Sequence, residues 1–228
     1  MIRCVDVTKT YKKNRGVQNI HFTLQQGQIT TLVGANGAGK STMIKLLTQQ
    51  IQADSGQIEG VDKEQLRYMP DDLTFPDTLT AKEIISLLGQ LKRVNAEQQK
   101  AVLEQVGLGD KSHLKVSQYS KGMRQRLNLA QSLLGDGQLY ILDEPTNGLD
   151  PFWIAKLKTI LTAHREQGHI VLFSTHHLNL AQEIADQVVM LHEGEVLDQG
   201  SIAELLATQQ CETLEQLWLR LTKKDELL

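Results

Sequence analysis

Apolar positions along the chain gather in short, largely apolar runs that alternate with stretches of helical spacing. The runs have the length of buried strands and fall at 28–33, 139–142 and 170–174. Each is followed by a stretch in which apolar residues recur every three or four positions, which predicts helices. These helices are expected at about 41–48, 152–165 and 178–185. Strands that alternate with helices are typical of an α/β fold with a mostly parallel sheet covered on both faces.

Shorter strands are expected outside this alternation. Apolar residues lie among polar ones near the start of the chain, at Val17, Ile20, Phe22 and Leu24. Their spacing becomes two from Ile20 onward, which indicates a strand of an N-terminal antiparallel part. Short runs at 56–59 and 66–69 predict two more strands. Runs at 188–191 and 195–197, on either side of a Glu-Gly turn, predict a hairpin.

The pattern becomes purely helical in the middle of the chain. Residues 80–94 carry apolar side chains at helical spacings. These side chains are Ile84, Ile85, Leu87, Leu88, Leu91 and Val94. Asn95 followed by Gln98 is typical of a capped helix start, so a second helix is expected there. A third helix is expected at about 120–134, so the segment from about 72 to 135 is predicted to be an α-helical subdomain.

Length and composition fit one domain with an inserted subdomain. The chain has 228 residues, of which 40% are hydrophobic, enough for a packed core. We therefore expect a single domain over 1–228, with its core at about 1–71 and 136–228. The two cysteines, Cys4 and Cys211, lack the spacing of a disulfide framework or a metal site, so a reducing compartment is expected.

Charge and hydropathy exclude several classes of protein at this stage. The formal net charge is −3, whereas nucleic-acid-binding domains usually carry a basic face, so no nucleic-acid partner is expected. No stretch reaches the ~18 consecutive apolar residues of a membrane span. Residues 1–11 also lack the basic and apolar regions of a signal peptide. The chain is therefore expected to be soluble.

The strongest chemical signal follows the run at 28–33. The next segment matches G-x-x-x-x-G-K-[ST] between a predicted strand and a predicted helix, which is the context that this P-loop motif requires. Its residues are Gly34, Ala35, Asn36, Gly37, Ala38, Gly39, Lys40 and Ser41, and Thr42 after them completes the predicted ATP site. Glycines let the backbone aim N–H groups at phosphates, and a helix N-terminus favours anions. Lys40 is expected to reach the β- and γ-phosphates, and the Ser41 hydroxyl to bind Mg²⁺.

Two acids end the apolar run at 139–142. Asp143 is placed to hold Mg²⁺ in a P-loop ATPase, and Glu144 is placed to take a proton from the attacking water. Such a pair is commonly a solvated turn. The P-loop favours a functional pair here, because open α/β sheets bind ligands beyond the ends of their strands. The sequence therefore predicts ATP binding and hydrolysis.

Further motifs, in their order along the chain, resemble those of the ATP-binding subunits of ABC transporters. The resemblance covers residues 1 to about 222. Residues 119–123 (Tyr-Ser-Lys-Gly-Met) are similar to the family signature, and 145–150 (Pro-Thr-Asn-Gly-Leu-Asp) to the D-loop. Residues 174–176 are similar to the segment of the switch histidine, and Tyr11 stands where an aromatic residue stacks on adenine.

The resemblance implies roles for individual residues. His176 is expected to assist catalysis. Ser120, Gly122 and Asp150 are expected to contact the ATP of a second subunit, because two subunits of this family form a head-to-tail dimer. Taken without the resemblance, Ser120 is better explained as a plain helix N-cap. A single histidine near the end of a strand is likewise usually structural.

Two departures from the family pattern stand at functional positions. The signature has Lys121 in place of a glycine and Met123 in place of glutamine. Asp71, within 68–72, stands where the family has a glutamine that contacts Mg²⁺ and the water. A carboxylate can also reach Mg²⁺, directly or through water, so Asp71 is a candidate metal ligand. The alternative is that Asp71 only caps the segment that follows Pro70.

The departures resemble the branch of ABC ATPases that pair with separate export-type or maturation-type permeases. The resemblance implies ATP and Mg²⁺ as cofactors, a second copy or a homologous ATPase subunit as partner, and a transmembrane permease docked on the helical subdomain. It also implies a peripheral position on the cytoplasmic face of the cell membrane. Residues 73–77 are a candidate permease contact or an ordinary loop that contains Pro76.

The expected function is to power a transporter, in particular an exporter, by ATP hydrolysis. Two alternatives remain open at this point. One is a soluble ABC ATPase that acts on a macromolecule such as a ribosome. The other is a nucleotide-dependent regulatory module with low turnover, which the departures at Asp71 and Lys121 would suit.

Overall fold

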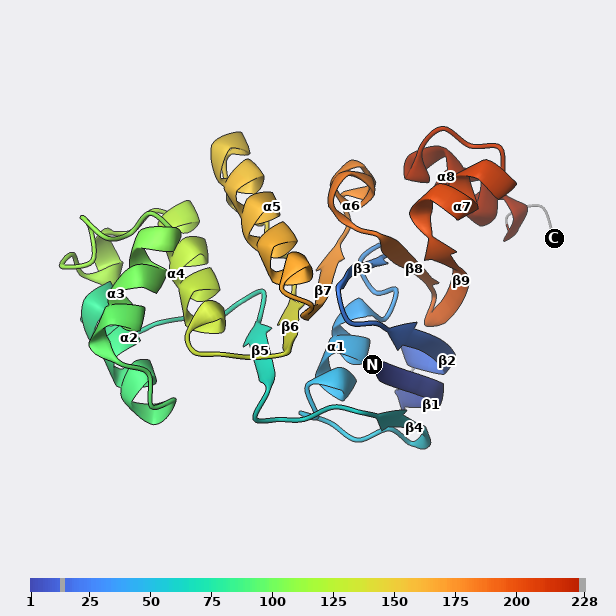
Figure 1. Ribbon diagram of the computed structural model, residues 1–228. Helices are drawn as coiled ribbons and strands as arrows, with labels where there is room; N and C mark the ends of the chain where they lie inside the picture. Colours follow the sequence, from blue (N-terminus) through green and yellow to red (C-terminus); the bar gives the residue numbers. More distant parts are fainter. Residues whose placement is uncertain (13–14, 226–228) are drawn as a thin grey trace.

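A six-stranded sheet forms the centre of the computed structural model, which describes residues 1–12 and 15–225 (Figure 1). In spatial order its strands are β5 (Leu66–Met69), β6 (Leu139–Leu142), β7 (Ile170–Thr175), β3 (Gln28–Val33), β8 (Gln187–His192) and β9 (Glu195–Ser201). Neighbouring strands from β5 to β8 run parallel, and β9 pairs antiparallel with β8 as a hairpin. The prediction of a mostly parallel sheet is confirmed.

A smaller antiparallel sheet packs beside it, with the strand order β2-β1-β4. Its strands are β1 (Ile2–Tyr11), β2 (Arg15–Leu24) and β4 (Ser55–Glu59). The sequence predicted β2 and β4 but not β1. Both long strands carry a bulge, where Asp6 and Asn19 adopt left-handed backbone with φ of 50° and 52°. The extra residue breaks the alternation of apolar positions, which is why the pattern of period two is visible only from Ile20.

Each face of the large sheet contributes to a separate hydrophobic cluster. On β6, Ile141 packs with the small sheet and α1 (Lys40–Leu47). The neighbouring Tyr140 and Leu142 point to the other face. They pack with α5 (Pro151–Glu166) and with the α-helical subdomain, which is called the helical lobe from here on. Alternation along a strand of this kind is the expected result of burial on both faces.

The helical lobe lies at the β5 end of the sheet, on the left in Figure 1. It contains α2 (Ala81–Leu91), α3 (Ala96–Gln105), the short 3₁₀ helix η1 (Val116–Gln118) and α4 (Lys121–Leu133). Capping boxes start α2 at Thr80 and α3 at Asn95, and the one at Asn95 was predicted. The expected continuation of the first helix to residue 94 is wrong, because Arg93 adopts left-handed backbone with φ of 57° and ends it.

Three further helices follow β7 and β9. The first, α6 (Leu178–Ile184), agrees with the prediction. The other two, α7 (Ile202–Thr208) and α8 (Leu214–Asp225), were not predicted. Both α7 and α8 pack together with α6 on the β8 side of the sheet, and both are drawn in red in Figure 1. Within residues 1–12 and 15–225, no helix combines the length and the apolar character that a membrane crossing requires.

Candidate active site

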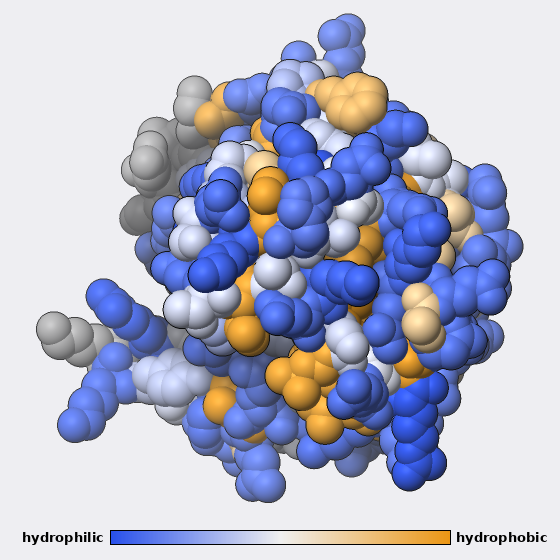
Figure 2. All heavy atoms as spheres, turned by 90° about the vertical axis from the view of Figure 1, so that its left-hand side faces the viewer, coloured by the Kyte–Doolittle hydropathy of each residue, from blue (hydrophilic) through white to orange (hydrophobic). Residues whose placement is uncertain are grey.

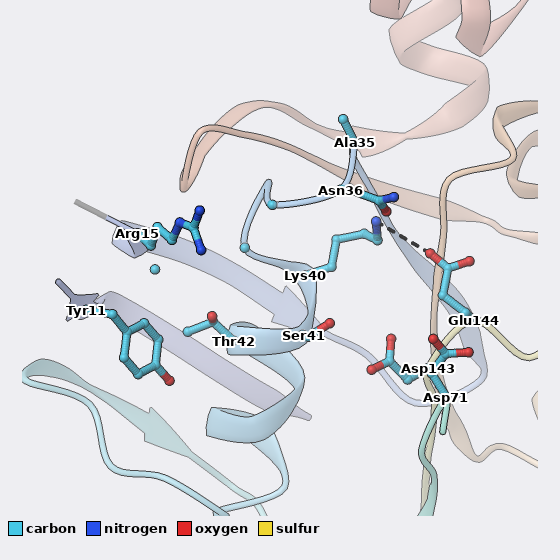
Figure 3. A pocket seen from close by; sticks show the side chains of 13 residues that line it. Tyr11, Arg15, Ala35, Asn36, Lys40, Ser41, Thr42, Asp71, Asp143 and Glu144 are labelled. Carbon is cyan, nitrogen blue, oxygen red and sulfur yellow. Dashed lines mark ion pairs between the residues drawn. The ribbon is translucent and has the colours of Figure 1, made fainter. Parts of the chain in front are cut away.

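A cavity of about 480 Å³ opens at the carboxyl edge of the large sheet (Figure 3). Its walls come from the loops that follow β3, β5 and β6, together with the facing ends of β1 and β2. The lining residues are Tyr11, Arg15, Gly16, Ala35, Asn36, Gly37, Gly39, Lys40, Ser41, Thr42, Asp71, Asp143 and Glu144. Parallel strands end at a common edge of their sheet, so residues far apart in sequence meet in this cavity.

Gly39 makes the sharp entry into α1 possible. Its φ of 106° lies in the region that favours glycine, and a Cβ there would lie 2.6 Å from Val17 Cγ1 and 2.9 Å from the Gly16 carbonyl oxygen. The helix therefore begins directly at Lys40. Because the first N–H groups of a helix have no intrahelical acceptor, this end of α1 is suited to bind phosphate oxygens. Ser41 and Thr42, in the first turn, line the cavity.

The Lys40 ammonium is held inside the P-loop. Its Nζ donates a hydrogen bond of 2.7 Å to the Gly34 carbonyl oxygen and lies 3.5 Å from Glu144 Oε1. The side chain is only 7% exposed, so its charge acts at short range with little solvent screening. Gly34 and Ala38 belong to the motif but not to the cavity wall. Gly34 supplies the acceptor for Lys40, and Ala38 is buried behind the loop.

Glu144 follows β6 in a strained conformation. Its φ of 46° is left-handed, which costs a non-glycine residue about 1–3 kcal/mol and is typical of functional positions. The Glu144 N–H donates to Ser174 Oγ at 2.9 Å, and that hydroxyl donates to Asp143 Oδ1 at 2.5 Å. The carboxylate itself is paired with His176, whose Nδ1 lies 2.9 Å from Glu144 Oε2. The P-loop lysine, the acid and the histidine therefore form one constellation.

The surroundings of Asp143 disfavour the ionised form of its carboxyl group. Burial raises its pKa, and the nearby negative charges of Asp71 and Glu144 raise it further, against the hydrogen bond from Ser174 and the charge of Lys40. A cation between these carboxylates would relieve the repulsion. Together with the Ser41 hydroxyl, Asp143 and Asp71 offer the hard oxygen ligands that Mg²⁺ prefers. The donor set fits a magnesium ion.

Asp71 lies in the cavity wall near Asp143, as Figure 3 shows. Its Oδ1 accepts a hydrogen bond of 2.7 Å from Asn147 Nδ2. This contact joins the segment after β5 to the loop after Glu144, and the sequence did not predict it. Tyr11 also lines the cavity and is 43% exposed, so one side of its ring is available to a ligand. Arg15 is a further lining residue that the sequence analysis missed, since it stands in a polar stretch without a motif.

The residues expected to act on a second subunit lie outside this cavity. Ser120 Oγ accepts from the Met123 N–H at 3.2 Å and caps α4. Asp150 Oδ1 accepts from the Trp153 N–H at 2.9 Å and caps α5. Within one chain, both side chains therefore have a structural role, as the capping alternative for Ser120 proposed.

The glycines near these caps bring the signature and the D-loop into contact. A Cβ on Gly122 would lie 2.8 Å from the Gly148 carbonyl oxygen, and a Cβ on Gly148 would lie 2.8 Å from Lys121 Cγ. The side chain of Lys121, which replaces a glycine of the family signature, thus packs over the D-loop.

Side-chain amides of α4 attach this helix to the catalytic edge. Gln125, Asn128 and Gln131 are spaced by three residues, so they follow one side of the helix. Their amides donate to the carbonyl oxygens of Glu144 at 3.3 Å, Pro70 at 2.6 Å and Tyr68 at 2.8 Å, respectively. The helix that begins at Ser120 is therefore tied both to Glu144 and to the segment that leads to Asp71.

Comparison with known proteins supports an ABC-type assignment. The sequence profile described as "ABC transporter" matches residues 17–147. The chain is 33% identical over 204 residues to the lantibiotic transport ATP-binding protein SrtF of Streptococcus pyogenes, with 86% of this chain and 89% of SrtF covered. It is 35% identical over 217 residues to a fluoroquinolones export ATP-binding protein of Mycobacterium tuberculosis, with 90% and 72% covered. It spans 64% of the length of the uncharacterized ABC transporter ATP-binding protein sll0415 of Synechocystis, at 33% identity over 226 residues and 90% of this chain.

Similar solved structures support the same ABC-type assignment. An ATP-binding subunit of an ABC transporter superimposes with a TM-score of 0.89 at 26% identity, covering 97% of this chain and 99% of that one. A dimeric ATP-binding cassette in a post-hydrolysis state, bound to ADP and Pi, has a TM-score of 0.79 at 23% identity, covering 89% and 99%. At 23% identity, the similarity to this second structure shows a shared fold only. The chain belongs to the ABC transporter family, and its relatives are ATP-binding subunits of that family.

Proposed function

We propose that the chain hydrolyses Mg·ATP as one half of a head-to-tail dimer and thereby drives a separate membrane permease that exports its substrate. The observation that carries the proposal is the constellation of Lys40, Glu144 and His176 beside the P-loop. Ser120 and Asp150 lie outside the cavity that holds this constellation, so the motifs at 119–123 and 145–150 are free to serve the ATP of a second subunit.

The chain's own groups account for the hydrolytic step. The N–H groups at the start of α1 donate hydrogen bonds to the phosphate oxygens, and Lys40 exchanges the Gly34 carbonyl oxygen and Glu144 for phosphate oxygens. Glu144 then takes the proton of the water that attacks the γ-phosphorus, while His176 fixes the orientation of its carboxylate. The bond from the γ-phosphorus to the bridging oxygen of the β-phosphate breaks, and ADP and inorganic phosphate leave. Ser41, Asp143 and Asp71 would hold Mg²⁺, which supplies neutralisation of the phosphate charge.

The dimer is supported by the chemistry of the α4 N-terminus. Ser120 offers a hydroxyl next to the first N–H groups of a helix of 13 residues, which together favour an anion. In a head-to-tail dimer this anion is the γ-phosphate held by the P-loop of the other subunit. The dimeric cassette with the same fold is consistent with such an arrangement.

The helical lobe is the proposed docking surface for the permease. Figure 2 shows this side of the molecule, where groups of apolar atoms lie between hydrophilic ones. Exposed leucines of the lobe are Leu73, Leu87 and Leu91, at 39%, 55% and 75% exposure. Within residues 73–77, Phe75 is buried and Asp77 pairs with Arg124 at 3.0 Å, so Leu73 is the exposed large hydrophobic side chain of this stretch. The relative named for fluoroquinolones export supports the export direction, and the relative named for lantibiotic transport is consistent with a peripheral position at the membrane.

Affinity purification from detergent-solubilised membranes of the native cell tests the transport role. A tagged Glu144→Gln chain, loaded with ATP, is expected to retain a protein with several membrane spans in fixed ratio. The matched control carries Leu73→Asp and Leu91→Asp in addition to Glu144→Gln, and it should lose that protein. In the wild-type background, the same two aspartates should leave ATPase activity unchanged. Recovery of ribosomal proteins or nucleic acid in place of a membrane protein would contradict the transport role.

Asp71→Asn is expected to raise the Mg²⁺ concentration needed for half-maximal ATPase activity and to leave the rate at saturating Mg²⁺ nearly unchanged. The substitution removes a charge from the proposed metal site, while the side-chain oxygen can still accept from Asn147. A titration of activity with Mg²⁺ measures the effect. Asp72→Asn is the matched control, because Asp72 is the neighbouring exposed acid and does not line the cavity. Superimposable curves for Asp71→Asn and the wild type would contradict the metal role.

A further inference from the structure

The helix α8 brings a tryptophan next to the first residues of the P-loop and to His176. A second, small cavity of about 170 Å³ is lined by Gly34, Ala35, His176, Leu178 and Trp218. Gly34 and Ala35 begin the P-loop, His176 follows β7, and Leu178 is the first residue of α6. Trp218 comes from α8, which has no catalytic motif and was not predicted from the sequence.

The buried side of α8 packs on the elements that carry those catalytic segments. Leu214 and Leu217 are fully buried in a cluster with Val33, Ala181 and Met190. Val33 is the last residue of β3 and directly precedes Gly34. Ala181 belongs to α6, which begins two residues after His176. The position of α8 is therefore fixed relative to both the P-loop and the histidine.

Polar contacts and an aromatic contact hold Trp218 in place. The Gln182 side chain on α6 accepts from the Leu214 N–H at 2.8 Å and donates to the Glu212 carbonyl oxygen at 3.3 Å, which attaches the start of α8 to α6. The indole of Trp218 packs edge-on against His192, with ring centroids 6.1 Å apart and an interplanar angle of 81°. A large side chain with few rotatable bonds is thereby kept at the cavity wall.

His176 depends on such a wall more than the rest of the site does. Its side chain is 45% exposed, whereas those of Lys40 and Glu144 are 7% and 10% exposed. Its Nδ1 contacts Glu144, and its ring packs against the exposed His177, with ring centroids 4.0 Å apart. The helix that follows has only seven residues, and no side chain caps its N-terminus. We infer that Trp218 is a positioning residue for ATP hydrolysis, which restricts the ring of His176 so that it orients Glu144. This inference rests on the proposed role of His176.

Trp218→Ala is expected to lower kcat by about ten- to a hundredfold, because small misplacements of catalytic groups have effects of this order. The KM for ATP should change much less, since Lys40 and the start of α1 are untouched. Trp218→Phe should retain most of the activity. Leu219→Ala is the matched control, because Leu219 is the next residue of the same helix and is 48% exposed. Its kcat should equal that of the wild type.

A double-mutant cycle with His176→Ala gives the decisive readout. If Trp218 acts through His176, Trp218→Ala should add little to the loss that His176→Ala already causes. Independent, multiplicative losses would overturn the inference. So would an unchanged kcat in Trp218→Ala accompanied only by a lower Tm, since that is the signature of a purely structural role.

Fluorescence provides a measurement that does not depend on the folding of Trp218→Ala. The chain has two tryptophans, so Trp153→Phe leaves Trp218 as the sole reporter. Its emission should change on addition of ATP without Mg²⁺, and this change should require about ten- to a hundredfold more ATP when Lys40→Ala is added. Constant emission at saturating ATP would overturn the inference. Failure of the proposed function is recognised separately, because Glu144→Gln would then keep wild-type turnover whatever Trp218 does.

Discussion

Glu144→Gln is expected to bind ATP with nearly wild-type affinity and to hydrolyse it about 10²- to 10⁴-fold more slowly. Glutamine preserves the shape of the side chain but cannot take a proton from water, and loss of a general base has this magnitude. The observed pairing of Glu144 with His176 and Lys40 is the geometry from which the expectation follows. Single-turnover hydrolysis and equilibrium binding of ATP measure the two quantities.

Glu193→Gln is the matched control. Glu193 is exposed and also has left-handed backbone, with φ of 48°, so a general effect of Glu→Gln at such a position would appear in both variants. Only Glu144→Gln should lose turnover. With saturating Mg·ATP it should also accumulate as a dimer of twice the monomer mass in light scattering, because ATP at the interface is no longer removed. A monomer under these conditions would contradict the head-to-tail dimer.

Lys40→Ala is expected to weaken ATP binding about ten- to a hundredfold and to abolish measurable hydrolysis at millimolar ATP. A hydrogen bond from a charged group contributes about 1.5–3 kcal/mol, and the Lys40 ammonium is the buried cation of the P-loop. Binding is measured by calorimetry in the absence of Mg²⁺, so that the metal ligands do not contribute.

Lys45→Ala on the same helix provides the control for that experiment. Its side chain is exposed and lies outside the cavity. The substitution Lys45→Ala therefore removes the same charge from α1 without changing the P-loop. Lys45→Ala should bind and hydrolyse ATP as the wild type does. Normal ATP affinity and turnover in Lys40→Ala would show that the nucleotide is held elsewhere.

The parts of the site that lie within one contiguous segment could be predicted from the sequence. The P-loop consists of consecutive residues between a strand and a helix, so its residues and their context are visible together. Asp143 and Glu144 were found because they directly follow an apolar strand, and neighbouring parallel strands end at one edge. The fold class followed from the same alternation of strands and helices.

Contacts between distant segments could not be predicted. Asn147 meets Asp71, and Ser174 joins Asp143 to the Glu144 backbone, only after the strands have assembled. The strand β1 was missed because its bulge at Asp6 shifts the apolar period by one residue. For α8 a signal was present, since Leu214, Leu217, Trp218 and Leu221 have helical spacing. What the sequence lacked was any indication that Trp218 lies beside the P-loop.

The most direct test of the account is the rate at which the purified chain releases phosphate from ATP. The central claim is that Glu144, beside the P-loop, makes this chain an ATP hydrolase. The account predicts a saturable release of phosphate that requires Mg²⁺, stops when the metal is chelated, and falls at least a hundredfold in Glu144→Gln. Equal rates for the wild type and Glu144→Gln at saturating Mg·ATP would contradict it.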